Sequence, residues 1–167
     1  TQYSEWDIFT TTTNAAPDAY GTAGSITASG AIVTSTLNIY SYWSNVDFSL
    51  SSASASNLNQ VSLQFLVWGQ ASGLTTPPSL FVQGELIGID ANQNQIFYQQ
   101  SFTHPDFGPT TYTGFLYQWD LSELDVSDYR IDFQLRVHNS LDKVRLDTSA
   151  EALIPELTPI IPVSPDC

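Results

Sequence analysis

Few side chains in this sequence could act as a general base or activate a nucleophile, because it has 2 histidines and its 1 cysteine is the last residue. A Ser-His-Asp arrangement needs a histidine held between a nucleophile and a carboxylate. His104 stands before a proline in a Thr-His-Pro-Asp segment, and His138 ends an expected strand on its polar side. Neither lies in a Gly-x-Ser-x-Gly turn, and the 17 acids are scattered instead of paired as in a glycosidase. We therefore expect a protein that is not an enzyme.

Oxygen ligands occur in two places that could hold a hard cation such as Ca²⁺. In the first, Asp90, Asn92 and Asn94 alternate in a segment whose composition predicts a hairpin turn. The glycine and the glutamate of an EF-hand loop are missing there, so a plain turn is the alternative. The second set combines four carboxylates from the two ends of the body: Glu5, Asp7, Asp142 and Asp147. It rests on the calcium that β-sandwich carbohydrate modules often hold between their first and last strands. Ca²⁺ is thus the candidate cofactor.

Aromatic side chains are numerous, with 4 Trp, 8 Tyr and 9 Phe. Sugars stack their apolar faces on exposed rings, while nearby polar groups bind the hydroxyls. In residues 37–43, alternation places Tyr40 and Tyr42 on one face, and Trp68 stands on the more polar face of its own strand. These three residues are the predicted carbohydrate platform. Packing of the same rings in the core or across strands is the alternative.

Hydrophobic residues with a period of two indicate that strands must position these groups. The clearest segments are 60–68, with one fully apolar face, and 129–138, which alternates strictly between apolar and polar residues. The other expected strands are 31–35, 37–43, 46–50, 80–89, 95–102, 111–119 and 143–146. About nine short strands separated by turn residues predict an all-β fold, a single antiparallel β-sandwich of the jelly-roll or immunoglobulin-like kind with extended termini.

The ends of the chain differ from the body. Residues 1–14 are expected to form an extended segment that could donate a strand to a neighbour, residues 15–149 the β-sandwich domain, and residues 150–167 a Pro-rich apolar tail. Prolines every three or four residues exclude a helix or a central strand in that tail. An extended apolar end must cover something, either its own sandwich or a neighbouring molecule. The predicted assembly residues are Trp6, Ile8, Phe9, Ile160 and Ile161.

Charge narrows the choice of partners. The net charge is -13 with only 4 Lys and Arg, which argues against nucleic acid, since phosphate binding needs clustered cations. No run of about 18 apolar residues is present, so no membrane span is expected. The chain starts at Thr1 and contains no Met, and its surface is expected to be rich in Ser and Thr and poor in Lys. These features predict a processed protein located outside the cell or at its surface.

Four short segments of the sequence, taken in their order and spacing, are similar to those of a known family: YSEWDIF at 3–9, NIYS at 38–41, QWDLS at 118–122 and SLDKVRLDT at 140–148. With them the chain resembles PEP-CTERM-type exported proteins of environmental bacteria, especially planctomycete-like ones. The resemblance implies a secreted, surface-associated all-β protein, often tied to extracellular polymer, and it brings no catalytic residues. The sequence departs from that pattern at Pro155-Glu156-Leu157, which only approximates the sorting tripeptide.

Two functions are compatible with these observations. The first is a secreted structural subunit of an extracellular matrix, filament or surface layer, whose partner is a second copy joined through sheet edges and terminal segments. The second is a non-catalytic carbohydrate-binding module that binds an exopolysaccharide through the aromatic platform. Formation of filaments by the protein would favour the first function. Slower migration of the protein in affinity electrophoresis on a glycan would favour the second.

Overall fold

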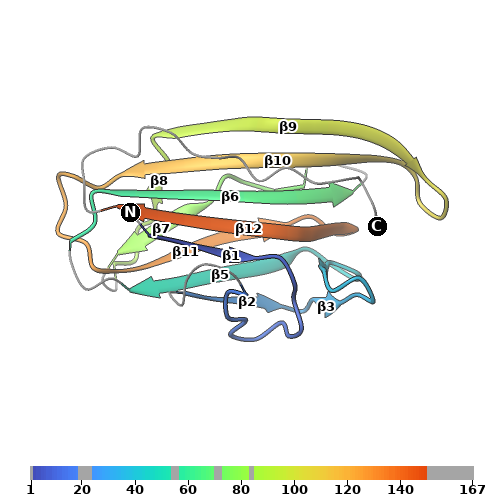
Figure 1. Ribbon diagram of the computed structural model, residues 1–167, viewed down its shortest axis with the longest axis horizontal. Coiled ribbons are helices and arrows are strands. Elements are labelled where there is room, and N and C mark those ends of the chain that lie inside the picture. Colours follow the sequence, from blue (N-terminus) through green and yellow to red (C-terminus); the bar gives the residue numbers. More distant parts are fainter. Residues whose placement is uncertain (1, 19–23, 54–56, 70–72, 83–84, 150–167) are drawn as a thin grey trace.

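The computed structural model describes residues 2–18, 24–53, 57–69, 73–82 and 85–149. Within these ranges the chain is 62% strand with no helix, and its strands form two antiparallel sheets that face each other (Figure 1). The predicted all-β, two-sheet architecture is therefore confirmed. No helix of the described residues has the length and apolar character needed to cross a membrane.

The larger sheet contains seven strands. In spatial order they are β3 (Ile32–Val33), β4 (Ile39–Tyr40), β12 (Asn139–Ser149), β6 (Gln60–Gly69), β10 (Gly108–Asp120) and β9 (Gln93–His104), and β1 (Gln2–Trp6) pairs with β12 on the side of β4. The smaller sheet contains five, in the order β2 (Ser25–Ser29), β5 (Val46–Ala53), β11 (Asp128–Leu135), β7 (Ser79–Val82) and β8 (Ile89–Asp90). All pairs are antiparallel, so alternate residues of each strand point into the space between the sheets.

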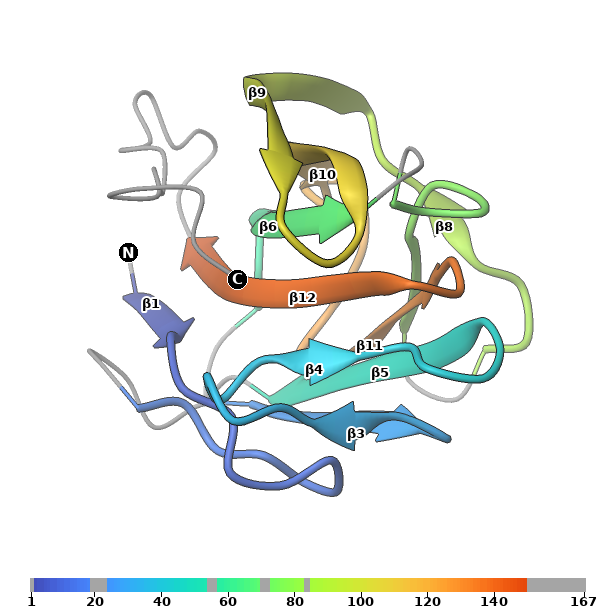
Figure 2. The ribbon, with the colours of Figure 1, turned by 90° about the vertical axis from the view of Figure 1, so that its right-hand side faces the viewer.

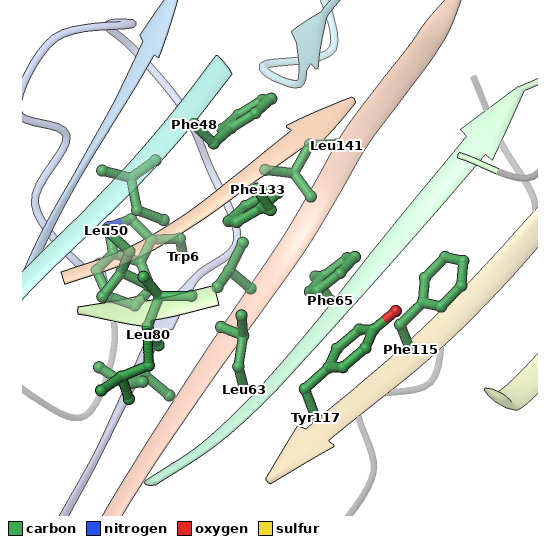
Figure 3. Packing of buried hydrophobic residues seen from close by; sticks show 14 of the residues in the cluster. Trp6, Phe48, Leu50, Leu63, Phe65, Leu80, Phe115, Tyr117, Phe133 and Leu141 are labelled. Carbon is green, nitrogen blue, oxygen red and sulfur yellow. The ribbon is translucent and has the colours of Figure 1, made fainter. Parts of the chain in front are cut away.

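The core fills that space (Figure 3). β11 alternates as predicted, with its apolar residues buried and its polar residues at least partly exposed. Phe133 of this strand stacks on Phe48 of β5 with 4.9 Å between ring centroids, and on Phe65 of the opposite sheet with 5.2 Å. Phe65 also stacks on Tyr117 of β10. Aromatic stacking thus joins the two sheets at the centre.

The structure has 12 strands among its described residues instead of about nine. Two of the extra strands, β1 and β2, lie in segments where the apolar alternation is short. The third arises because residues 80–89, expected as one strand, form the β7–β8 hairpin, in which Leu80 pairs with Ile89. These short strands form because each pairs with a neighbouring strand. The alternation of residues within one segment does not reveal such pairing.

The expected hairpin at residues 90–94 is wrong. β8 belongs to the smaller sheet and β9 to the larger one, so this segment passes from one sheet to the other. The Trp119 indole N–H donates to the Ile89 carbonyl at 2.9 Å, and the Asn92 N–H donates to the Gln118 carbonyl at 2.8 Å. These bonds attach the segment to β10. The Asp and Asn residues lie where the chain passes from one sheet to the other. This passage needs the same backbone freedom as a tight turn.

The N-terminal segment is part of the sandwich. Each residue of β1 is paired with β12, from Gln2 opposite Thr148 to Trp6 opposite Val144. The side chains of Trp6 and Phe9 are completely buried in the chain's own core, and the Trp6 indole N–H donates to the Ala15 carbonyl at 2.9 Å. This corrects the role predicted for Trp6 and Phe9 as anchors for a neighbour, because both already fill this core.

Ile8 is different, since its side chain is 50% exposed and stays available for contact. The other predicted assembly residues, Ile160 and Ile161, and the whole tail 150–167 lie outside the described residues.

Candidate functional site

An aromatic pocket of about 290 Å³ lies at one end of the sandwich. Figure 2 looks onto this end, where the tip of the β9–β10 hairpin stands in front of β6 and where β4 lies beside β12. The pocket is lined by Tyr40, Tyr42, Trp68, Gly69, Phe107, Thr110 and His138. All three residues of the predicted carbohydrate platform are in this set, although 28 positions separate Tyr40 from Trp68 (68 minus 40).

Strand register explains how these residues meet. Tyr40 stands opposite Ser140, Ser140 opposite Trp68, and Trp68 opposite Tyr112. Directly opposed residues in antiparallel strands point to the same face of a sheet. Trp68 therefore stands on the outer face of the larger sheet, away from the main core. It joins Leu66 and Tyr112 in a small second cluster that covers part of that face.

Rings from two separate segments form the walls. On one side, Tyr40 and Tyr42 meet edge to face at 5.9 Å, and Tyr42 meets Trp43 at 4.7 Å. On the other side, the tip of the β9–β10 hairpin places His104 parallel to Trp68 at 5.8 Å and Phe107 at 6.1 Å from it.

Exposure divides these rings into a floor and a rim. Tyr42, Trp43 and Phe107 are 49%, 72% and 44% exposed, while Tyr40 and Trp68 are buried. Tyr42 and Phe107 are the two exposed rings that line the pocket, and together with a buried tryptophan they form the arrangement that a flat, partly apolar ligand needs.

The Trp68 indole N–H has no hydrogen-bond partner within the described part of the chain. By contrast, the indole groups of the two core tryptophans, Trp6 and Trp119, each donate to a backbone carbonyl at 2.9 Å. A buried donor without an acceptor costs about 1–3 kcal/mol. The nitrogen itself is almost fully covered, so a ligand oxygen would accept from this N–H, and recover that cost, only if the rings around it moved.

A buried polar network holds the walls in place. The Ser41 hydroxyl donates to the Asn139 carbonyl at 3.0 Å and accepts the Asn139 backbone N–H at 3.0 Å, and the His138 N–H donates to the Ser41 carbonyl. His138 has a φ of 64°, in the left-handed region that histidine adopts more readily than most residues. A Cβ on Gly69 would come within 2.0 Å of the Asn139 side-chain oxygen, so the network requires a glycine there. Tyr40 and Tyr42, on either side of Ser41, are thereby fixed in direction.

The pocket carries no formal charge. Its lining residues include no Asp, Glu, Lys or Arg. Burial, and secondarily the neighbouring Tyr42, raises the pKa of Tyr40 above its ordinary value, so this phenol keeps its proton at neutral pH. The Tyr40 hydroxyl lies 3.4 Å from the His138 Nδ1. A neutral ligand suits such a surface, because no fixed charge is present to pair with an ionic one.

The structure brings the second predicted metal set into one neighbourhood, since β1 pairs with β12. Cations lie between these carboxylates, however. Arg145 binds Asp147 through two nitrogens at 2.8 and 3.0 Å and lies 3.9 Å from Glu5, and Lys143 lies 3.8 Å from Asp7. In the described ranges, no three His, Cys, Asp or Glu side chains are placed to hold a metal ion. The arrangement is an ion-pair network on the outer face of the sheet.

The first predicted metal set is spread over the crossing between the sheets. Asp90 belongs to β8, and Asn94 to β9. The Asn92 side-chain oxygen accepts the Asp120 N–H at 2.6 Å and is thus already used by the fold. Calcium at Asp90, Asn92 and Asn94 stays a prediction.

Stability should depend on pH through Asp142, which sits at a bulge between Leu141 and Lys143 of β12. Burial raises the pKa of Asp142 to about 6, although Lys143 acts in the opposite direction. The unfolded chain loses this proton near pH 4, so it binds fewer protons than the folded protein between pH 4 and 6. We therefore expect the free energy of unfolding to fall by about 2–3 kcal/mol as the pH rises through this window and to level off above it.

Urea unfolding at a series of pH values measures this dependence. Asp142→Asn should flatten it, and Glu123→Gln, at an exposed acid, should leave it unchanged. Burial also raises the pKa values of Glu5 and Asp7, so part of the slope should persist in Asp142→Asn. An equally steep fall in Asp142→Asn and in the unaltered protein would contradict the assignment.

A larger groove, of about 690 Å³, crosses the outer face of the smaller sheet. Hydroxyl groups of Thr27, Ser29, Ser49, Thr76 and Ser79 line it. Its longer polar side chains bind each other: Gln134 donates to Asp47 at 2.8 Å, and Arg130 to Asp132 at 2.9 Å. Because these groups are satisfied, the groove offers a ligand less than the aromatic pocket does. In the sequence most of its residues belong to the polar half of alternating strands, which is also the pattern of a solvated face.

Four residues of the pocket were not predicted: Gly69, Phe107, Thr110 and His138. Phe107 and His138 lie in connections between strands, and only the packing of the hairpin tip beside Trp68 reveals their position. His138 was expected on the polar side of a strand, and it is indeed exposed but turned toward Tyr40.

No protein-family model matches this sequence, and the comparisons with curated proteins and with solved structures likewise find no match. The resemblance to PEP-CTERM-type exported proteins thus stays a prediction. A functional assignment must come from the geometry of the pocket and from the physical chemistry of its residues.

Proposed function

We propose that this protein is a secreted, non-catalytic carbohydrate-binding module whose site is the aromatic pocket at the end of the sandwich. The observation that carries the proposal is the buried Trp68 indole N–H, which has no partner in the described chain and belongs to a residue that lines one pocket with the exposed rings of Tyr42 and Phe107. Rings would stack on the apolar face of a sugar, and the indole would donate to one of its oxygens. Whether the sandwich is of the jelly-roll or the immunoglobulin-like kind stays a prediction.

The size and charge of the pocket define the ligand class. Ligand pockets usually measure about 300–1,000 Å³, so a volume of about 290 Å³ suits a single sugar unit, such as the end or a side branch of a polysaccharide. The uncharged lining favours a neutral sugar, and the net charge of -13 repels anionic polymers at low salt. Affinity for a neutral glycan should therefore change little with ionic strength.

Substitutions at the rim and the floor should weaken binding to different extents. Tyr42→Ala removes an exposed ring and should lower the affinity for a neutral glycan about tenfold, which corresponds to about 1.4 kcal/mol. Trp68→Phe keeps an aromatic floor but removes the N–H donor and should lower the affinity about 2- to 10-fold, the value of one hydrogen bond. Affinity electrophoresis on a panel of neutral and acidic polysaccharides identifies the glycan, and calorimetric titration gives the constants.

Leu86→Ala is the matched control, because Leu86 is 92% exposed and does not line the pocket. It should bind as the unaltered protein does. If no glycan in the panel retards the protein, or if Tyr42→Ala and Leu86→Ala behave alike, the pocket is not a sugar site.

A secreted structural subunit of an extracellular matrix, filament or surface layer is the second candidate function. The observation that favours it is the long edge of the larger sheet, where β9 offers 12 residues without a charged side chain. Electron microscopy of the protein at high concentration would show ordered assemblies if this function is correct. If the protein binds glycans and forms no assemblies, carbohydrate binding is the function that remains.

A further inference from the structure

β9 forms the outer rim of the larger sheet. It runs from Gln93 to His104, and among the described residues only β10 pairs with it (Figure 1). The other edge strands of the two sheets are short: β1 and β2 have 5 residues each, and β3 and β8 have 2 each. β9 is therefore the one long stretch of unprotected backbone along an edge of the described sandwich.

The side chains of β9 lack the usual protection of an edge. Soluble proteins prevent edge-to-edge pairing with charged residues, prolines, bulges or very short strands. β9 contains no Lys, Arg, Asp, Glu, Pro or Gly in its 12 residues. One bulge is present: Gly114 pairs with Tyr98 and Phe115 with Ile96, so Phe97 has no opposite residue. Residues 98–104 remain a regular segment opposite 108–114.

Charge points to a second copy of the same chain as the partner. Two molecules of net charge -13 repel each other, and the repulsion is smallest where their contact contains no acids. Residues 98–104 meet that condition. Two identical antiparallel strands also match each other across a two-fold axis, so every contact occurs twice. An unrelated partner would have no such matched edge.

We propose that residues 98–104 of β9 pair antiparallel with the same residues of a second copy, with the two-fold axis at Ser101. Gln99 then lies opposite Thr103 of the other copy, and Ser101 opposite its own equivalent. The side chains of Gln99, Ser101 and Thr103 are all exposed and polar in the isolated chain, and they are able to form hydrogen bonds across the new strand pair. The two larger sheets become one continuous sheet.

Sedimentation of the full chain without sugar tests the dimer. Strand pairing with few other contacts gives a small interface, and small interfaces are weak. The mean mass should therefore rise from 18.4 kDa toward twice that value between about 10 µM and about 1 mM. Added salt should strengthen the dimer by screening the repulsion. Ser101→Lys places two ammonium groups directly opposite each other and should raise the dimer dissociation constant at least about fivefold.

Leu86→Lys is the matched control: it changes the net charge by the same amount at a side chain that is 92% exposed on the β7–β8 turn. Thr103→Lys, also exposed and on β9, is a second variant that should weaken the dimer. A protein that stays monomeric over the whole concentration range overturns the proposal. So does a dimer on which both β9 variants act no more strongly than Leu86→Lys. The dimer does not depend on glycan binding, since Ser101 and Thr103 do not line the pocket.

Discussion

Trp6→Ala should lower the free energy of unfolding by about 3–5 kcal/mol, the cost of deleting a large buried aromatic side chain. The Trp6 ring is fully buried and its N–H donates to the Ala15 carbonyl, which also accepts the Ile26 N–H, so the substitution leaves a cavity and removes one of these two hydrogen bonds. Ile8→Ala, two residues further along, should cost less than about 1 kcal/mol because that side chain is half exposed. Guanidinium unfolding followed by circular dichroism measures both values.

The difference between the losses of unfolding free energy in Trp6→Ala and Ile8→Ala tests whether the N-terminal segment packs in the sandwich of its own chain. Trp6→Phe serves if the alanine variant does not fold, since it keeps most of the volume and removes the hydrogen bond, at about 1–2 kcal/mol. Equal and small effects at Trp6 and Ile8 would mean that β1 is not an integral strand.

Arg145→Met should cost about 3–5 kcal/mol, because it leaves the carboxylate of Asp147 buried without its cation. Asp147 is 1% exposed, and Arg145 binds it through two nitrogens while its guanidinium lies 4.4 Å from the centre of the Tyr3 ring. The hydrogen bonds that Arg145 donates to Asp147 are the largest cause that raises the pKa of Arg145, and they keep this cation charged. The loss should be read from chemical unfolding at pH 7.

Two further variants give this prediction its controls. Arg130→Met breaks a pair of similar length, 2.9 Å to Asp132, but both partners are exposed, so the cost should be below about 1 kcal/mol. The double variant Arg145→Met/Asp147→Leu should recover most of the stability, because it removes the buried charge together with its partner. If Arg145→Met costs no more than Arg130→Met, the network on β1 and β12 is not buried in solution.

Period-two alternation was enough to predict the strands of the central sheet region and the fold class. It fixes which residues of β11 face the core, because its apolar and polar residues alternate without interruption. It failed for residues 90–94, because a turn and a crossing between sheets need the same residue types. It also could not tell whether Trp6 packs in its own chain or in a neighbour, since both partners bury the same ring.

For the candidate site too, the sequence pattern predicts features within one strand but not which strands pair with each other. Tyr40 and Tyr42 line one pocket, although β4 ends at Tyr40 and Tyr42 lies beyond the strand, and only register places Tyr40, Ser140 and Trp68 in one row. The exposure of Tyr40 was overestimated, because the strands beside β4 and the ring of Tyr42 cover it. The missing hydrogen bond of Trp68 has no counterpart in the sequence, because the acceptor of a tryptophan N–H can lie far away in the chain, as Ala15 does for Trp6 and Ile89 for Trp119.

Those four tryptophans provide the most direct measurement of the central claim, that the aromatic pocket binds a neutral sugar. Each indole N–H gives its own signal in a proton–nitrogen correlation spectrum, and Trp68→Phe assigns one of them. On titration with the glycan identified by the panel, the Trp68 signal should move strongly as its N–H gains an acceptor, and that of the exposed Trp43 should move as well. The signals of Trp6 and Trp119, whose N–H groups already donate to carbonyls, should stay in place. Shifts confined to other parts of the chain, with the Trp68 signal unchanged at saturation, would contradict the account.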